Sequence, residues 1–181
     1  MPATMHRFTS DDYWALPEGR RAELIDGELY DMAPPSWEHQ GIVLELARKL
    51  ADFIDSQEGD CKVRVAPVAV NLFADDTTWL EPDVMVVCDP SKISHRGVVG
   101  APDFIAEVVS PSSGRMDYLT KADRYARAGV REYWIVDAET RQTAVYRYEE
   151  GDVTPTFYPF SQPVPVGIWD GCFILVEECA G

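Results

Sequence analysis

A glutamate within an apolar run is the residue whose position most needs a chemical explanation. Glu107 lies in the run Phe104–Val109 ("FIAEVV"), which otherwise has the composition of a buried strand. Because an unpaired buried charge is costly, Glu107 needs a partner. The structural alternatives are an ion pair with a helix lysine or arginine, or a place on a solvated face of the sheet.

A second carboxylate opens another apolar run. Asp83 precedes Val84–Val87 in "EPDVMVV", and alternation along a strand puts it on the same face as two of those apolar residues. If the two strands are neighbours, Asp83 and Glu107 meet at one end of the sheet. Adjacent carboxylates repel unless a cation lies between them, and oxygen ligands suit Mg²⁺ or Mn²⁺. The pair therefore indicates a metal site or a pair tuned for proton transfer, although Pro82-Asp83 is also a common turn dipeptide.

A lysine on the following helix could complete such a site. Asp117, Lys121 and Tyr125 are spaced i, i+4 and i+8, so they share one face of a helix predicted over residues 116–128. If this helix packs back onto the sheet, the Lys121 ammonium reaches the strand ends, where it suits a developing anion or an attacking water. The alternative is an i,i+4 salt bridge between Asp117 and Lys121, which contributes only about 0.3–0.5 kcal/mol.

The elements that must position these residues alternate between strands and helices. In order, the sequence predicts a short helix within residues 8–17, a hairpin at Asp26-Gly27, a helix from Ser36 to about Glu58, strands at 62–65, 68–73, 83–88 and 104–109, a helix at 116–128, strands at 133–136 and 143–148, and one or two edge strands in the tail. The unit from Phe104 to Val136 predicts a right-handed crossover between parallel strands. We expect one α/β (α+β) domain over residues 1–181, with a mixed central sheet flanked by helices.

The charge balance counts against non-specific nucleic-acid binding. The formal net charge is −15, from 16 Lys and Arg against 31 Asp and Glu, whereas such binding depends on cations that neutralise phosphates. One stretch nevertheless concentrates positive charge and predicts a local basic face. Its members are Arg115, Lys121, Arg124, Arg127 and Arg131.

The cysteines and the apolar runs bear on the compartment. No run approaches the roughly 18 apolar residues that cross a bilayer, and the N-terminal residues lack an apolar signal region. The four cysteines, Cys61, Cys88, Cys172 and Cys179, show no zinc-site spacing. We therefore expect a cytoplasmic protein with free thiols and no membrane partner.

Four segments together resemble a known family. They are "ELIDGELYDMAPPSWEH", "EPDVMVVCD", "PDFIAEVVSPSS" and "DYLTKADRYARAGVREYWIVD", in this order. The chain is similar to the Uma-type restriction endonuclease family, formerly a domain of unknown function, within the PD-(D/E)XK nuclease superfamily. The resemblance spans about residues 8–150 and implies a restriction-endonuclease-like fold.

The resemblance also implies roles for particular positions. Asp83 and Glu107 match the metal-binding carboxylates of the superfamily, and the Val108 carbonyl would be a third ligand. The usual lysine falls two residues after the second carboxylate, where this chain has Val109. Lys121 matches a lysine that has moved to the following helix, from which its ammonium could still reach the attacking water.

Two further residues have open roles. Glu28, after the hairpin turn, could add an acidic ligand or be an exposed hairpin residue. His39, near the start of the long helix, could support the site or a substrate phosphate, or be a capping or surface histidine.

The leading hypothesis is a nuclease that cleaves DNA. It would use Mg²⁺ (or Mn²⁺) held by Asp83 and Glu107, with Lys121 assisting, and would act as a homodimer with one active site per strand. The alternative is a catalytically inactive binding or scaffold protein on a nuclease fold, favoured by the net charge and by Val109. A metal-independent glycoside hydrolase using the same two acids is a third reading, but nothing in the sequence places an aromatic cleft beside them.

Overall fold

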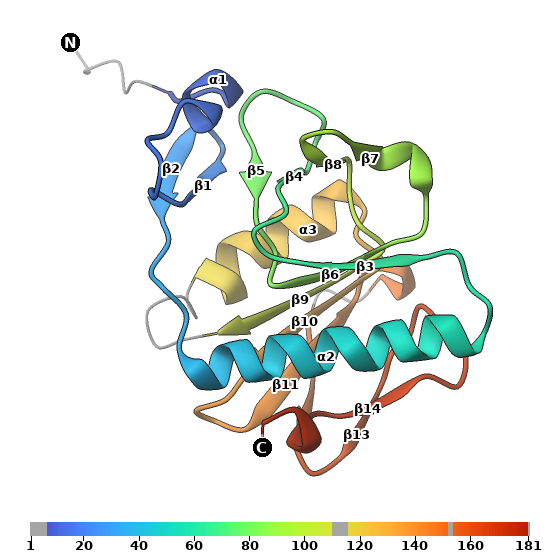
Figure 1. Ribbon diagram of the computed structural model, residues 1–181. Coiled ribbons are helices and arrows are strands. Elements are labelled where there is room, and N and C mark those ends of the chain that lie inside the picture. Colours follow the sequence, from blue (N-terminus) through green and yellow to red (C-terminus); the bar gives the residue numbers. More distant parts are fainter. Residues whose placement is uncertain (1–6, 110–115, 152–153, 181) are drawn as a thin grey trace.

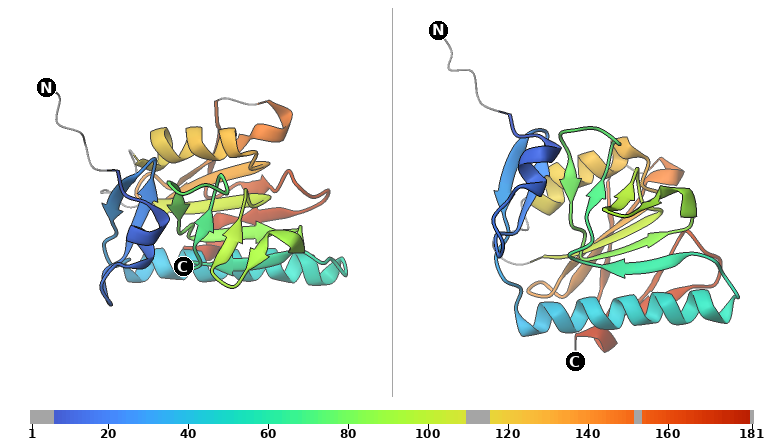
Figure 2. Two further views of the ribbon diagram at one scale, coloured as in Figure 1. Left: turned by 90° about the horizontal axis from the view of Figure 1, so that it is seen from above. Right: turned by 45° about the horizontal axis from the view of Figure 1, so that its top comes forward.

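A six-stranded mixed sheet in the order β12-β11-β10-β9-β6-β3 forms the centre of the molecule (Figure 1). Its strands are β3 (Lys62–Val65), β6 (Val84–Val87), β9 (Phe104–Val109), β10 (Glu132–Asp137), β11 (Gln142–Arg147) and β12 (Thr156–Pro159). The computed structural model describes residues 7–109, 116–151 and 154–180. Helix α2 (Trp37–Ser56) covers one face of this sheet and α3 (Ala122–Ala128) the other, as the view from above shows (Figure 2).

The register of the central strands decides where the two predicted carboxylates lie. Strands β9 and β10 are parallel, with Glu107 beside Ile135, which confirms the predicted crossover geometry. Strands β6 and β9 are antiparallel, with Val84 opposite Ala106. One step further along this register, Asp83 faces Glu107 where β6 begins.

A second sheet packs over the α3 side of the first, in the order β2-β1-β5-β4-β8-β7. Its strands are β1 (Ala22–Ile25), β2 (Glu28–Asp31), β4 (Val70–Asn71), β5 (Trp79–Leu80), β7 (Ile93–Ser94) and β8 (Gly97–Val99). The predicted hairpin is confirmed: Asp26 and Gly27 both have positive φ, 52° and 82°, as a two-residue turn of this type requires.

Several of the short strands depart from the sequence prediction. The strand predicted at 68–73 is only two residues long. The segment between the predicted strands 83–88 and 104–109, for which the sequence predicts no element, contains a 3₁₀ turn (Pro90–Lys92) and the hairpin β7–β8. Strand β5 was not predicted either. Strands of two or three residues are too short to show an alternating pattern, so the sequence carries no signal for them.

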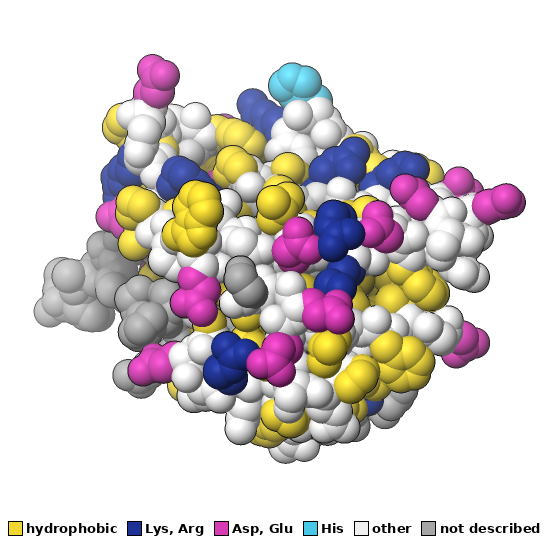
Figure 3. Space-filling view, turned by 60° about the horizontal axis from the view of Figure 1, so that its bottom comes forward, with side chains coloured by type: hydrophobic (Ala, Val, Ile, Leu, Met, Phe, Trp, Pro, Cys, Tyr) yellow, Lys and Arg dark blue, Asp and Glu magenta, His cyan; other side chains and the backbone are white. Residues whose placement is uncertain are grey.

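Helix α2 has the caps and the apolar face that its sequence predicts. Ser36 accepts a hydrogen bond from the His39 backbone N–H and caps the first turn. The buried face consists of Ile42, Val43, Leu46, Leu50 and Ile54. On the opposite side, acidic and basic side chains lie next to one another, so this face of the molecule has no single-sign patch (Figure 3).

The short helix before the first hairpin is also confirmed. Helix α1 (Ser10–Trp14) begins with Thr9, whose backbone and side chain both donate to the Asp12 carboxylate. Only Tyr13 of this helix is buried. Helix α1 therefore rests on the second sheet and leaves Trp14 partly open to solvent.

The predicted helix over residues 116–128 has two parts. Met116–Lys121 is π-helical, and α3 continues from Ala122. It ends at Gly129, which has φ of 89° and so adopts the left-handed conformation expected of a terminal glycine. The segment Ser110–Ser113, which follows the predicted strand 104–109, and the basic residue Arg115 lie outside the described residues.

The C-terminal region completes the core on the α2 side. Strand β12 is the edge strand of the central sheet, while β13 (Pro163–Pro165) and β14 (Phe173–Leu175) form a separate pair. A 3₁₀ turn, Val176–Cys179, packs against α2. Within the described residues, no helix combines the length and apolar character needed to cross a membrane.

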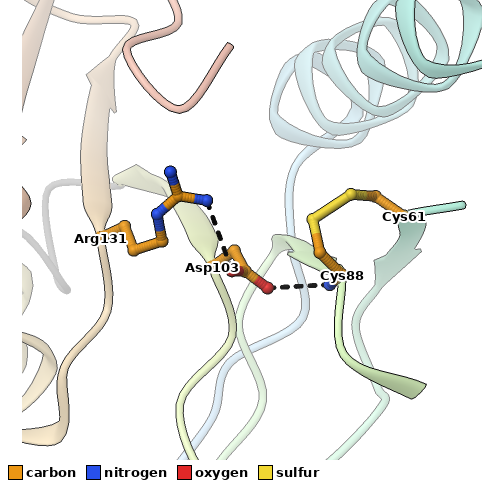
Figure 4. The surroundings of a disulfide bond; sticks show 4 residues. All are labelled: Cys61, Cys88, Asp103 and Arg131. Carbon is orange, nitrogen blue, oxygen red and sulfur yellow. Dashed lines mark hydrogen bonds and ion pairs between the residues drawn. A yellow bond between two sulfur atoms is a disulfide. The ribbon is translucent and has the colours of Figure 1, made fainter. Parts of the chain in front are cut away.

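Two of the cysteines contradict the expectation of free thiols. Cys61 and Cys88 are joined by a disulfide with an S–S distance of 2.08 Å (Figure 4). The ladder between β3 and β6 pairs Lys62 with Val87, so the flanking cysteines face each other. The sequence prediction was wrong because this pairing depends on strand register. Cys172 and Cys179 are free and buried, as expected.

Candidate functional site

Asp83 and Glu107 adjoin at the end of the central sheet. The Asp83 backbone N–H donates to Glu107 Oε2 at 3.3 Å, and the Val108 N–H donates to Asp83 Oδ2 at 2.8 Å. The structure therefore brings together the three residues that the resemblance assigns to a metal. The antiparallel register of β6 and β9 is the cause, because it sets the two carboxylates opposite each other.

The helical segment that follows β9 donates hydrogen bonds to the Glu107 side chain. This side chain is only 4% exposed, and its Oε1 accepts hydrogen bonds from Lys121 Nζ at 2.9 Å and from the Tyr125 hydroxyl at 2.8 Å. Both donors come from the π-helical segment and the start of α3. The ion pair with a helix lysine, the first structural alternative for Glu107, is therefore present, and the alternative of a solvated sheet face is excluded.

Lys121 is shared among three carboxylates. Its Nζ lies 2.9 Å from Glu107 Oε1, 2.9 Å from Glu23 Oε2 and 3.4 Å from Asp117 Oδ1. The salt bridge with Asp117 exists, but it is one contact of three. All four side chains are buried, so this cluster differs in kind from a surface i,i+4 pair.

Glu23 is the site residue that sequence reasoning missed. It lies in β1, whose four residues are all buried, and its Oε1 also accepts from the Glu81 backbone N–H at 2.9 Å. The available signal was the one that drew attention to Glu107: a carboxylate within an apolar run, here "AELI". Glu28 lies instead on the exposed strand β2, where it accepts a hydrogen bond from the Tyr30 hydroxyl. The structure does not bring it into the cluster.

His39 projects from the first turn of α2 towards Asp83. Its Nε2 lies 3.1 Å from Asp83 Oδ2, so the structure places it at the carboxylate pair rather than on the helix surface. Burial alone would lower the pKa of His39, but the hydrogen bond and charge of Asp83, together with the Val108 backbone, raise it. The protonated ring is therefore favoured beside this carboxylate.

Carboxylates outnumber cations in this cluster. The acidic members are Glu23, Asp83, Glu107 and Asp117, and the cations are Lys121 and, when protonated, His39. Burial, opposed by Lys121 and reinforced by Asp83, raises the pKa of Glu107 well above its usual range. Burial would lower the pKa of Lys121, yet the surrounding carboxylates raise it well above the usual value. The cluster thus holds negative charge that its own cations do not balance.

The oxygens at Asp83 and Glu107 fit a divalent cation. Asp83 uses only Oδ2 for its contacts with described residues, and Glu107 Oε2 accepts only the long bond from Asp83 N–H. Within the described part of the chain, no three His, Cys, Asp or Glu side chains are arranged to hold an ion by themselves. Mg²⁺ needs no such cage, because proteins bind it through one or two carboxylates while it keeps several waters.

The four described members of the predicted basic face do not form a free positive surface. Arg124 pairs with Asp26 and Asp123, and Arg127 also pairs with Asp123. Arg131 pairs with Glu149 at 2.9 Å, and Lys121 is buried in the cluster. The prediction failed because the stretch is spread around a helix and meets carboxylates from other elements.

Comparisons with known proteins agree with this architecture. The model of the Uma2 family, described as "Putative restriction endonuclease", matches residues 10–168. The uncharacterized protein slr1290 of Synechocystis sp. is 25% identical over 154 residues, which cover 83% of this chain and 80% of that protein. A crystal structure from Anabaena variabilis, described as a putative nuclease belonging to DUF820, aligns with a TM-score of 0.76 at 20% identity, covering 96% of this chain and 97% of that one. The mixed α and β fold predicted from the sequence is confirmed, and so is the family resemblance.

Proposed function

The chain belongs to the Uma2 family, and from this premise we propose that it is a metal-dependent endonuclease that hydrolyses DNA phosphodiester bonds. The family assignment supports a nuclease-like function in general. The observation that carries the proposal is the cluster of four buried or half-buried carboxylates around Lys121 and His39, in which Asp83 and Glu107 adjoin. A divalent cation would neutralise the charge of these carboxylates, and a phosphodiester is a substrate that such a cation activates.

Asp83 and Glu107, with the Val108 carbonyl, would hold Mg²⁺ or Mn²⁺. When bound at such a site, the cation lowers the pKa of water and stabilises the charge that develops on a phosphate. Lys121 and Tyr125 fix one oxygen of Glu107 through their hydrogen bonds. His39 does the same for Asp83. The two carboxylates are therefore oriented before a ligand arrives.

Lys121 fits the role of a positioning residue. All its close partners are carboxylates, and its side chain is only 7% exposed. We expect it to set the orientation and charge of Glu107 rather than to touch the substrate. Val109, at the usual lysine position, packs with the apolar cluster on the α3 side and offers no group that could replace the ammonium.

The carboxylate contacts of the Lys121 ammonium also favour a second candidate function. In this candidate, the chain is a binding protein on a nuclease fold and has no catalytic activity. An ammonium already shared by three carboxylates has little freedom to reach an attacking water. A metal-dependent cleavage assay distinguishes the two candidates. Double-strand cleavage would also need two active sites, which a symmetric homodimer supplies; sedimentation of the protein with and without DNA measures this.

A cleavage assay tests the proposal. The protein is incubated with supercoiled plasmid or circular single-stranded DNA, with Mg²⁺, Mn²⁺ or EDTA. We expect nicking only with the metals and none from Glu107→Ala or Glu107→Gln. Glu139→Gln, on an exposed turn, is the matched control and should cleave like the wild type. Cleavage by Glu107→Gln at the wild-type rate would mean a contaminating nuclease. Stable DNA binding without metal-dependent cleavage would favour the second candidate.

A further inference from the structure

A cleft lies between α1, the edge strand β3 and the turn that joins β7 to β8. Its volume is about 570 Å³. In Figure 1, α1 and the β7–β8 hairpin both lie above β3. The lining of the cleft includes one tryptophan and four basic or imidazole side chains, Trp14, Lys62, Arg64, His95 and Arg96.

The cleft gathers cations that have no acidic partner. Among the described residues, no carboxylate lies within ion-pair distance of Lys62, Arg64 or Arg96, whereas the cations on α2 and α3 are paired with acids. The one acidic side chain in the lining, Glu81, is already bound by Arg21 at 2.6 Å. In a protein with a net charge of −15, this is a local excess of positive charge. It contrasts with the mixed charges of the α2 side (Figure 3).

An aromatic ring borders the cations. Trp14 is 39% exposed, and its ring packs edge-on against Trp79 with centroids 5.1 Å apart. The Arg96 guanidinium lies over the Trp14 ring, 5.3 Å from its centre, so a base that stacks on this face displaces the guanidinium, which is then free to meet a phosphate. A fixed indole beside free cations is the combination with which proteins bind single-stranded nucleic acid, because bases stack on the ring while phosphates meet the charges.

A glycine holds the wall of the cleft in place. Gly97 has φ of 128°, and a Cβ at this position would lie 2.0 Å from the Ala69 carbonyl oxygen. The neighbouring Val98 N–H donates to the same oxygen at 2.9 Å. The hairpin that carries Arg96 is therefore packed directly on backbone, so the guanidinium is presented from a fixed support.

The cleft is connected with the carboxylate cluster. Its Glu81 donates a backbone hydrogen bond to Glu23 at 2.9 Å, and Glu23 contacts Lys121 Nζ at 2.9 Å. Strand alternation also puts Arg64 and Lys62 on the sheet face that bears Met85 and Val87, not on the α2 face. A ligand in the cleft thus lies on the same side of the sheet as the second-sheet residues that reach the cluster.

We propose that this cleft binds the sugar-phosphate backbone of one nucleic-acid strand, with a base stacked on Trp14. The inference rests on the proposed nuclease function and adds to it the form of the substrate near the site. The volume of about 570 Å³ falls in the range of about 300–1,000 Å³ that holds small ligands, so the cleft has room for one or two nucleotides of a single strand.

Binding in the absence of catalysis tests the proposal. The probe is a fluorescein-labelled single-stranded DNA 12-mer, measured by anisotropy in EDTA over a salt titration. We expect the triple variant Lys62→Ser, Arg64→Ser, Arg96→Ser to bind at least about tenfold more weakly. For this variant, the slope of log affinity against log salt concentration should be shallower by about 2, because three phosphate contacts with a single strand are lost. The matched control, Arg48→Ser, Arg127→Ser, Arg141→Ser, removes the same charge from paired surface cations and should bind within about twofold of the wild type.

Further results support or overturn the proposal. Trp14→Ala should weaken binding with the salt slope unchanged, because stacking is not ionic. Equal losses in the triple variant and the control, or no loss in either, would overturn the proposal. A deoxynucleoside monophosphate that competes as well as the 12-mer would also overturn it, since the cleft would then be a nucleotide site. Because the assay contains EDTA, loss of binding in the triple variant upholds the cleft even if the protein never cleaves DNA. If the triple variant binds and cleaves DNA normally, the proposed role of the cleft is rejected and the nuclease proposal still stands.

Discussion

Two glutamates are buried in neighbouring parallel strands of the central sheet, Glu107 in β9 and Glu132 in β10, exposed by 3% and 1%. Glu132 is surrounded by donors. It accepts from Trp134 Nε1 at 2.6 Å and from the Ile168 N–H at 3.1 Å. Glu107 has three donors, the Asp83 N–H, Lys121 and Tyr125, but shares its surroundings with three other carboxylates.

Under the proposed function, this difference distinguishes Glu132, a structural carboxylate, from Glu107, a carboxylate of the proposed site. Around Glu132 the structure is closed: a Cβ on Gly167 would come within 2.8 Å of Glu132 Oε2. Nothing there requires another cation. Around Glu107, like charges are held together at a stability cost that the fold does not require. Burial of a carboxylate is therefore weak evidence for a site, and unbalanced charge is stronger evidence.

The largest expected effect is on stability, from removing the shared cation. Lys121→Met leaves buried carboxylates without their ammonium, and breaking a buried pair in this way costs about 3–5 kcal/mol of unfolding free energy. The matching change at Glu132 is Arg147→Met, which removes the positive charge that acts on this glutamate. It should lower the unfolding free energy by less, because the neutral donors to Glu132 remain. Urea titrations followed by circular dichroism compare the two variants. Equal losses would mean that the two glutamates have similar surroundings.

The next effect is on activity. Glu107→Gln should lower the rate of plasmid nicking by at least about 100-fold, equivalent to about 2.7 kcal/mol of barrier. Its melting temperature should stay the same or rise, since the variant removes one like charge from the cluster. If Glu107→Gln were instead destabilised and its folded fraction still nicked DNA, Glu107 would be a structural residue and not a catalytic one.

Glu132→Ala provides the opposite pattern. It leaves the Trp134 and Ile168 donors buried without an acceptor, which costs about 1–3 kcal/mol of unfolding free energy. The rate of nicking per folded molecule should not change, as measured well below the melting transition. A loss of activity at full folding would place Glu132 in the catalytic site and remove the distinction.

The smallest effect concerns pH. Burial, only partly offset by the Trp134 N–H and Arg147, raises the pKa of Glu132 in the folded protein. The folded state then binds this proton more tightly than the unfolded chain. Stability from this group is therefore highest at low pH and falls as pH rises from the usual carboxyl range through the raised pKa. Urea midpoints measured across acidic pH should show a shallower decline in Glu132→Gln than in the wild type, and an identical slope would argue against the raised pKa.

The sequence predicts the elements that support the site better than it predicts which residues make up the site. The hairpin turn, the cap at Ser36 and the parallel pairing of β9 and β10 all follow from local rules. Glu23 gave the same signal as Glu107, and so did Glu132 in "REYWIVD". A carboxylate in an apolar run could not be classed as structural or functional until its neighbours in space were known.

Other features depend on contacts that no local pattern encodes. The π-helical turn before α3 brings Lys121 to Glu107, although regular helical spacing alone would also have put Asp117 beside it. The Cys61–Cys88 bond depends on the register of β3 and β6. The cleft depends on a hairpin with strands of only two and three residues. Each of these is set by tertiary packing.

The most direct test of the central claim is anomalous scattering from crystals grown with Mn²⁺. The account predicts a peak at coordination distance from one oxygen each of Asp83 and Glu107, and no peak in Glu107→Gln crystals. It would be contradicted if wild-type crystals showed no peak there, with Asp83 still bound to His39 and Glu107 still bound to Lys121.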